Sequence, residues 1–208
     1  VEGTLRGIGA VVNFRYRVLV NGLAVRVPVG RLAAVAAIPQ VTAVVPVSYL
    51  APAAAAQPLP QGPASTAPQA QPVTAGVDPA HIALIDAGVD VSHPYLGGGM
   101  GPTFPVMGGA DLVDGDAAPA AAPAAPEAEA HGTEMAGIVL RSPALQGLPA
   151  ERVPRMLVYR VVARELVDGR VRSLARSDRV LAGLEAAMDP NGDGDPRDGA
   201  DVVLLGLA

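Results

Sequence analysis

Two runs near the start of the chain alternate apolar and polar residues, as strands with one buried face do. FRYRVLV (14–20) and LAVRVPV (23–29) flank Asn21-Gly22, a dipeptide that strongly favours a tight hairpin turn. VGRLAAVAAI (29–38) has helical spacing, and VTAVVPV (41–47) predicts a third strand. The pattern predicts a β-β-α-β unit in residues 1–50, which is small for independent stability.

From residue 80 the pattern changes to short apolar runs that alternate with helical segments. HIALID (81–86), RMLVYRVV (155–162) and DVVLLGLA (201–208) predict buried strands. HGTEMAGIVLR predicts a helix that starts at His131, and SDRVLAGLEAAM (177–188) predicts an amphipathic helix capped by Ser177. This alternation predicts an α/β fold with a parallel sheet and helices on both faces. We expect residues 80–208 to be the amino-terminal part of a larger domain.

Two tracts contain few large apolar residues. Residues 51–79 are rich in Ala, Pro, Gln and Gly, which is the composition of a linker. Residues 117–130, AAPAAAPAAPEAEA, predict a solvated loop inserted in the second unit. The predicted organisation is therefore a small unit (1–50), a linker (51–79) and an α/β unit (80–208).

Composition excludes several classes of function. The 208 residues carry a net charge of -5, which argues against a nucleic-acid partner. There is no Cys, so neither a disulfide nor a thiolate metal site is expected. We expect no membrane span, because every 18-residue apolar window contains Arg, Gln or Pro. No signal peptide is visible after Val1.

The candidate catalytic residues are Asp86, at the end of a strand, and His131, at the predicted start of a helix. A hydroxyl nucleophile needs a general base, and the base needs a carboxylate to orient it. Each residue alone also has a structural explanation, because strand-end Asp residues form turns and a lone His is often structural. A buried carboxylate is costly without a partner, and an imidazole would supply one.

The local contexts of these two residues are more specific. LIDAGVDVSHPYL (84–96) resembles the catalytic-aspartate motif of subtilisin-like serine proteases (subtilases), and AHGTEMAGIV (130–139) resembles their catalytic-histidine motif. Their order along the chain also agrees. The resemblance implies that Asp86 orients His131 and that His131 acts as general base and then general acid. It implies polypeptide substrates and no cofactor for catalysis.

Two further segments extend the resemblance. ADVVLLGLA (200–208) resembles the strand that lies along the substrate in subtilases, which implies that Gly206 and Leu207 bind the substrate. VNGLAVRVPVGRLAAVAAIPQVTAVVP (20–46) resembles subtilase inhibitor propeptides. The resemblance implies a ferredoxin-like α+β propeptide that acts as an intramolecular inhibitor and is later cleaved off. It also implies a secreted protein.

Several positions depart from the family pattern. Ala87 stands where the family has Ser or Thr, Glu134 replaces a second His, and Gly206-Leu207-Ala208 replaces Ser-Leu-Gly. The nucleophile motif Gly-Thr-Ser-Met-Ala does not occur, and none of the six serines has that context. We therefore expect the chain to be inactive alone, as the amino-terminal part of a protease precursor.

A polar loop after the second helix suggests calcium. Asp189, Asn191, Asp193 and Asp195 alternate as in the opening of a calcium loop, with Gly194 between the last two. The twelfth position, usually Glu, is Ala200. Both interpretations remain open, a structural calcium site or a polar Asp-rich turn. His81 and His93 could suggest a metal site with Asp86, although His93 belongs to the protease motif.

Three functional hypotheses follow. The leading one is a secreted subtilisin-like serine endopeptidase precursor. The second is a non-catalytic relative that binds or inhibits peptides, in which Ala87 and the altered substrate strand accompany lost activity. The third, an unrelated nucleotide-binding α/β protein, is disfavoured because DAGVDVSHP (86–94) lacks the G-x-G-x-x-G phosphate loop.

Overall fold

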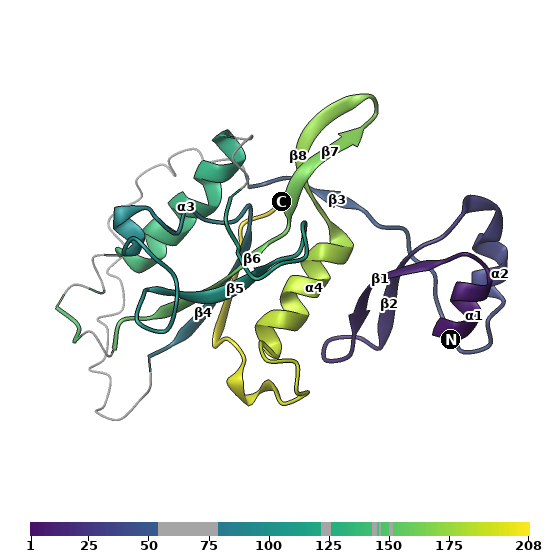
Figure 1. The fold of residues 1–208 in the computed structure, drawn as a ribbon, viewed down its shortest axis with the longest axis horizontal. Coiled ribbons are helices and arrows are strands. Elements are labelled where there is room, and N and C mark those ends of the chain that lie inside the picture. Colours follow the sequence, from purple (N-terminus) through teal and green to yellow (C-terminus); the bar gives the residue numbers. More distant parts are fainter. Residues whose placement is uncertain (54–78, 122–125, 143–144, 146, 150–151) are drawn as a thin grey trace, which may run out of the picture.

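The chain forms two units, which lie side by side in Figure 1. The computed structural model describes residues 1–53, 79–121, 126–142, 145, 147–149 and 152–208. Most of the predicted linker, residues 54–78, lies outside the described residues.

The larger unit is built on a four-stranded sheet with the order β5-β6-β4-β9. The strands are β4 (His81–Asp86), β5 (Val106–Asp111), β6 (Arg155–Arg160) and β9 (Val202–Leu205). Every neighbouring pair is parallel. The predicted α/β class is confirmed, and the three predicted strands coincide with β4, β6 and β9. Strand β5 was not predicted.

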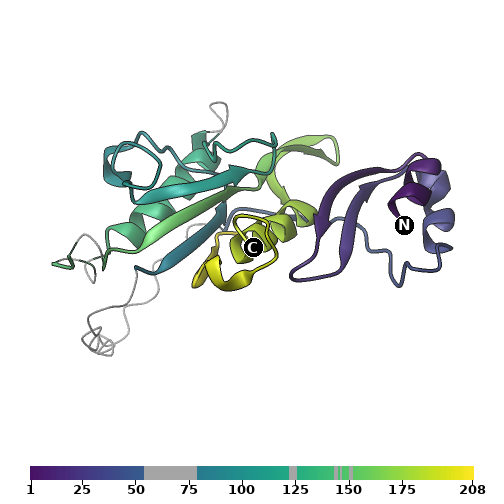
Figure 2. The ribbon, with the colours of Figure 1, turned by 60° about the horizontal axis from the view of Figure 1, so that its bottom comes forward.

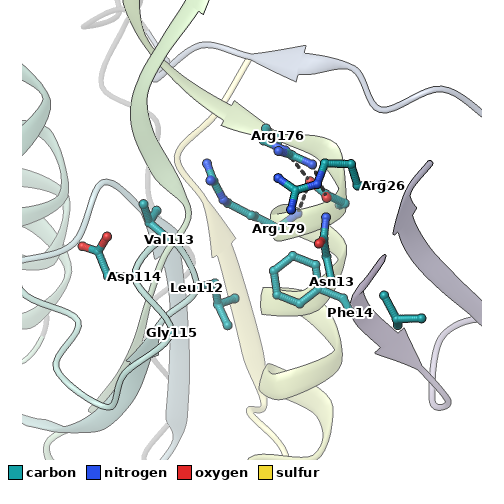
Figure 3. A pocket seen from close by; sticks show the side chains of 11 residues that line it. Asn13, Phe14, Arg26, Leu112, Val113, Asp114, Gly115, Arg176 and Arg179 are labelled. Carbon is teal, nitrogen blue, oxygen red and sulfur yellow. Dashed lines mark hydrogen bonds and ion pairs between the residues drawn. The ribbon is translucent and has the colours of Figure 1, made fainter. Parts of the chain in front are cut away.

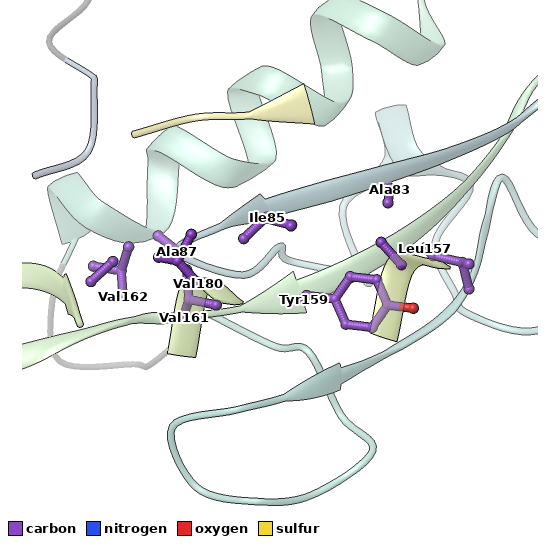
Figure 4. Close-up of a cluster of buried hydrophobic side chains, with 10 residues drawn as sticks. Ala83, Ile85, Ala87, Leu157, Tyr159, Val161, Val162 and Val180 are labelled. Atoms are coloured by element: carbon purple, nitrogen blue, oxygen red, sulfur yellow. The ribbon is translucent and has the colours of Figure 1, made fainter. Parts of the chain in front are cut away.

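Helices cover both faces of this sheet. Helix α3 (Pro126–Leu140) contributes Ala136 and Leu140 to a buried cluster with Leu84 and Val158. Helix α4 (Ser177–Met188) contributes Val180 and Ala187 to the cluster on the other face, which Figure 4 shows around Ile85. Neighbouring residues of β4 thus face opposite helices, because successive side chains of a strand alternate between faces.

Two details of the helices differ from the prediction. Helix α3 begins at Pro126, so residues 126–130 are helical rather than part of a loop. Proline suits the first turn of a helix, where no partner for its missing N–H is needed. Ser177 does not cap α4, because its hydroxyl accepts the backbone N–H of Ser48 at 3.0 Å.

A second sheet extends from the larger unit with the order β3-β8-β7. Strands β7 (Val162–Val167) and β8 (Arg170–Arg176) form a hairpin, and β3 (Tyr49–Leu50) pairs antiparallel with β8. Asp168 and Gly169 both have positive φ at the turn, 51° and 71°. The hairpin was not predicted, although Asp-Gly between alternating runs is a signal for this turn.

The smaller unit consists of a hairpin and short helices. Its elements are α1 (Glu2–Gly7), β1 (Val11–Tyr16), β2 (Gly22–Arg26), the 3₁₀ turn Val29–Arg31 and α2 (Leu32–Ala36). Leu5, Ala10, Val35 and Ile38 form its buried core. The sheet has only the two strands β1 and β2, so its described residues do not complete a ferredoxin-like sheet.

The predicted third strand, 41–47, is wrong. These residues form no strand, and Val44 and Val45 are 49% and 79% exposed. Pro46 has no N–H to donate to a sheet. Instead of joining β1 and β2, the segment leads the chain across to β3 (Figure 1).

The hairpin of the smaller unit packs against helix α4, and Figures 1 and 2 show this from two directions. Tyr16 and Ala24 form a buried cluster with Ala182. The hydroxyl of Tyr16 donates to the backbone carbonyl of Asp178 at 2.8 Å. In the described part of the chain, no helix has the length and apolar character needed to cross a bilayer.

Candidate active site

Asp86 and His131 meet at the carboxyl end of strand β4. Nδ1 of His131 lies 2.8 Å from Oδ1 of Asp86, and this oxygen also accepts the backbone N–H of Ala87 at 2.6 Å. The Asp86 side chain is fully buried, whereas that of His131 remains 16% exposed. The two residues predicted from sequence therefore form a hydrogen-bonded pair with only the imidazole open to solvent.

The second carboxylate oxygen of Asp86 is buried and has no hydrogen-bond partner among the described residues. Burial raises the pKa of Asp86 above its usual value, and the hydrogen bonds from His131 and Ala87 only partly oppose this. The neighbouring residue Ala87 is buried and has no side-chain donor to offer this oxygen. The carboxylate thus depends on His131 as its main polar partner.

Two glycines allow close packing around the loop after β4, Gly132 of helix α3 against this loop and Gly88 against residues 119–121. A Cβ added at Gly132 would overlap the carbonyl oxygen of Gly88. Gly88 has φ of 88°, and a Cβ there would lie 2.8 Å from the carbonyl oxygen of Pro119. Thr133 secures the same contact, since its hydroxyl accepts the backbone N–H of Asp90 at 2.9 Å. These contacts explain why glycine follows His131 and why the imidazole can reach Asp86.

The end of strand β9 lies directly against the pair. A Cβ added at Gly206 would overlap Oδ2 of Asp86 and lie 3.1 Å from Cε1 of His131. The N–H of Gly206 donates to the carbonyl of Ile85 at 3.2 Å, which fixes this close approach. Gly206 and Leu207, predicted from the sequence to contact a substrate, thus lie beside the candidate catalytic pair.

A contact that the sequence did not predict joins the two units. The carboxylate of Glu185, on α4, accepts four backbone N–H groups from residues 17–20, at 2.9, 2.8, 2.7 and 3.3 Å. Burial acts to raise the pKa of Glu185, but the four donors outweigh it and hold the pKa below its usual value. The only local signal was a Glu on a helix, so its partners could not be foreseen.

A cleft of about 480 Å³ opens beside this contact, between β1 and α4 (Figure 3). Its wall includes Asn13, Phe14 and Leu112 together with the ion pair between Arg176 and Asp178, 2.7 Å apart. The cleft belongs to the boundary between the units, and neither Asp86 nor His131 lines it.

The predicted calcium residues are only partly brought together. Oxygens of Asp189, Asp193 and Asp198 lie within 4.8 Å of one another, and Asp198 was not predicted. Asp195 is instead paired with the guanidinium of Arg197. The loop is also held internally, since Asp189 accepts the backbone N–H groups of residues 192–194 at 2.8–3.1 Å.

The other two histidines do not join Asp86. His93 caps a short 3₁₀ helix (Pro94–Leu96), where its Nδ1 accepts the N–H of Tyr95 at 3.3 Å, and its ring stacks on that of Tyr95. His81 lies at the opposite end of β4 from Asp86.

The sequence is similar to known proteins over part of its length. Residues 79–165 match the model of the subtilase family. The minor extracellular protease Vpr of Bacillus subtilis (strain 168) is 33% identical over 129 residues, which are 61% of this chain and 13% of the relative. The chain therefore spans a small part of the length of this curated relative.

Proposed function

We propose that this chain, whose residues 79–165 belong to the subtilase family, is part of a serine endopeptidase precursor that hydrolyses peptide bonds with an Asp-His-Ser triad. The observation that carries the proposal is the bond between His131 Nδ1 and the fully buried Asp86 Oδ1, 2.8 Å long. The related extracellular protease supports export of the protein.

In this mechanism His131 is the base and Asp86 its orienting partner. Because Nδ1 of His131 donates to Asp86, the other ring nitrogen, Nε2, is left to accept the proton of a hydroxyl nucleophile. The imidazolium that forms is stabilised by the adjacent carboxylate, and it then returns the proton to the leaving amine. No metal or organic cofactor is needed for these proton transfers.

These 208 residues do not contain the family's motif for the serine nucleophile. A serine hydroxyl would have to come from another segment of the protein, so we expect residues 1–208 alone not to hydrolyse peptides. A polypeptide substrate would pair with the backbone of Gly206 and Leu207, which lie beside the catalytic pair. Backbone pairing of this kind needs no side-chain hydroxyl, so the Gly-Leu-Ala sequence is compatible with it.

The small amino-terminal unit would act as an inhibitor propeptide in the same molecule. Its hairpin packs on α4, and Glu185 accepts four of its backbone N–H groups. Residues 49–53 then continue to the end of β9 and occupy the position where a substrate would pair. An inhibitor that fills this position blocks access to His131.

Calcium would serve stability rather than catalysis. Three carboxylates within 4.8 Å repel one another, and a hard divalent cation that prefers oxygen ligands would offset this repulsion. Asp189, Asp193 and Asp198 would supply these ligands, whereas Asp195 pairs with Arg197 and Asn191 accepts the backbone N–H of Asp193.

The test is His131→Ala in the full-length protein, with His81→Ala as the matched control on the same sheet. We expect His131→Ala to abolish both peptide hydrolysis and self-processing, and His81→Ala to retain both. Retained hydrolysis in His131→Ala would overturn the proposed mechanism.

The second hypothesis, a non-catalytic peptide-binding relative, is favoured by one observation. Oδ2 of Asp86 is buried and has no hydrogen-bond partner in the part of the chain that the structure describes, and the side chain of Ala87 has no donor to offer it. The same experiment separates the two hypotheses, because a non-catalytic relative would show no hydrolysis even with His131 intact.

A further inference from the structure

We infer that the precursor cuts its own chain at the peptide bond that follows Ala53. The inference rests on the proposed function and goes beyond it, because it names the bond and the residues that the cleft prefers. It starts from the short segment, residues 48–53, that joins the small unit to the rest of the chain.

This segment is paired on both sides. On one side β3 pairs antiparallel with β8, with Tyr49 opposite Arg176 and Leu50 opposite Ala175. On the other side Pro52 bridges Leu207 in antiparallel register. The segment therefore lies as an extra strand between β8 and the end of β9, which is how an extended peptide binds at a sheet edge.

The hydrogen bonds fix its register against the end of β9. The N–H of Ala51 donates to the carbonyl of Ala208 at 3.0 Å, and Ala208 returns its own N–H to Ala51 at 2.9 Å. The N–H of Ala53 donates to the carbonyl of Gly206 at 3.0 Å. Pro52 falls between the two donors, at a position where no N–H is required, so the sequence suits this register.

Ala53 is the residue of this segment that hydrogen-bonds to Gly206, the neighbour of the catalytic pair. Its partner Gly206 lies against both Asp86 and His131, since an added Cβ at Gly206 would overlap Asp86 Oδ2 and lie 3.1 Å from His131 Cε1. A strand advances about 3.3 Å per residue, so Leu50 lies about 10 Å further back along the segment. The carbonyl of Ala53 is thus the one placed for attack.

The side chains of the segment differ in their surroundings. Leu50 is half-buried and packs against the core cluster that contains Val162 and Ala175. Ala51 is exposed, whereas Pro52 and Ala53 are half-buried. The cleft therefore selects an apolar residue at the fourth position before the cut and a small uncharged residue directly before it.

The chemical step is an ordinary acyl transfer. A serine hydroxyl from the rest of the protein forms a bond to the carbonyl carbon of Ala53 while His131 takes its proton. The C–N bond to residue 54 breaks, and His131 gives the proton to the departing amine. Water then hydrolyses the ester, which frees the carboxylate of Ala53 and restores the serine.

The experiment follows processing of the full-length precursor by mass spectrometry of the new termini. We expect the mature chain to begin at residue 54. Ala53→Asp should slow its appearance at least tenfold, because a charged side chain would enter a half-buried position. Ala37→Asp, which places the same charge at an exposed position of the small unit, is the matched control. Ala53→Ser should process well, because it stays small and uncharged.

An independent substrate separates this inference from the proposed function. We expect the mature enzyme to hydrolyse the p-nitroanilide of Leu-Ala-Pro-Ala at least tenfold faster than that of Leu-Ala-Pro-Asp. Peptide hydrolysis with a mature terminus elsewhere, or with Ala53→Asp processed normally, would overturn the inference alone. Cleavage after Ala53 in a His131→Ala precursor would also overturn it, because another protease would then make the cut. Absence of any hydrolysis by the native protein would overturn both.

Discussion

Asp86 and Glu185 carry the same carboxylate group in two regions of the molecule, and their surroundings shift its pKa in opposite directions. Asp86 is fully buried, and one of its oxygens interacts with both His131 and the N–H of Ala87, whereas the other has no partner among the described residues. Glu185 lies at the boundary between the units, and both of its oxygens accept backbone N–H groups from residues 17–20. Burial raises the pKa of Asp86, whereas the four donors lower that of Glu185.

The ionised carboxylate of Asp86 thus destabilises the folded state, whereas that of Glu185 stabilises it. Ionised Asp86 costs folding free energy, because its desolvation exceeds what its hydrogen bonds return. Ionised Glu185 stabilises the contact between the units, because hydrogen bonds to a charged acceptor are stronger than those to a neutral one. A costly buried charge is expected where it serves chemistry, and a well-satisfied charge where it serves docking.

Asp86→Asn gives the largest expected effect. In the full-length protein we expect peptide hydrolysis to fall by about four orders of magnitude, as when the equivalent group is replaced in a well-studied triad enzyme. Thermal stability should be retained or raised, because the amide has no charge to desolvate. Hydrolysis within tenfold of the native rate would contradict the role of Asp86.

The stability difference between this variant and the native protein should depend on pH. The folded state keeps the proton of Asp86 to a higher pH than the unfolded state, whose pKa is about 3.9. Between the two pKa values unfolding releases a proton, so rising pH favours unfolding. Thermal unfolding from pH 3 to 8 should therefore show the advantage of Asp86→Asn growing with pH and then levelling off. An advantage that shrinks with rising pH would show that burial is not the dominant effect.

Glu185→Gln should weaken docking of the small unit about tenfold, because hydrogen bonds to a charged acceptor contribute roughly 1.5–3 kcal/mol and the amide retains one acceptor oxygen. The measurement is the lag before peptide hydrolysis begins after processing, which should shorten. Glu134→Gln, at an exposed position of α3, should leave the lag unchanged.

Acid should act in the same direction as this substitution. Because the folded pKa of Glu185 is lowered, its contribution is complete above the usual pKa of Glu and is lost as pH falls through the lowered value. The lag of the native protein should therefore shorten under acid conditions more than that of Glu185→Gln. Equal responses in the two proteins would assign the effect to other groups.

Calcium removal gives the smallest expected effect. We expect a chelator to lower the midpoint of thermal unfolding by a few degrees, since a bound ligand at about 5 times its Kd contributes about 1 kcal/mol. Asp193→Asn should remove this sensitivity, and Asp195→Asn, whose carboxylate pairs with Arg197, should largely keep it. If the midpoint of thermal unfolding is the same with millimolar calcium and with chelator, the loop is a polar turn and not a calcium site.

Local patterns were sufficient for the parts of the fold that depend on local chemistry. The apolar run 81–86 correctly predicted β4, and the helical spacing of apolar residues in 177–188 correctly predicted α4. The motifs around Asp86 and His131 predicted that the two side chains pair. Strand β5 was missed because VMGGAD (106–111) contains two glycines and lacks the apolar run of a central strand. The β7–β8 hairpin was missed although Asp168-Gly169 carried its signal.

Contacts between distant segments could not be predicted in this way. Residues 41–47 alternate like a strand, yet they pair with no strand in the described part of the chain, and residues 42–47 are exposed. The backbone N–H groups that donate to Glu185 belong to residues 17–20, which are separated from it by 165–168 positions in the sequence. The hydrogen-bond partners of Ala51 and Ala53 lie beyond residue 205. A pattern within one segment carries no information about which distant backbone completes it.

The two contacts of the small unit, at α4 and at the end of β9, are joined by only the short stretch 41–48. Such a connection makes the unit a bivalent ligand, and each contact then holds the other at a millimolar effective concentration. Neither contact has to be strong alone for the small unit to stay bound to the larger one. Val45, which is 79% exposed, lies within this stretch. If the small unit is the inhibitor proposed above, one cut there would replace a single tethered inhibitor with two separate and weaker ones, and the active site would open in one step.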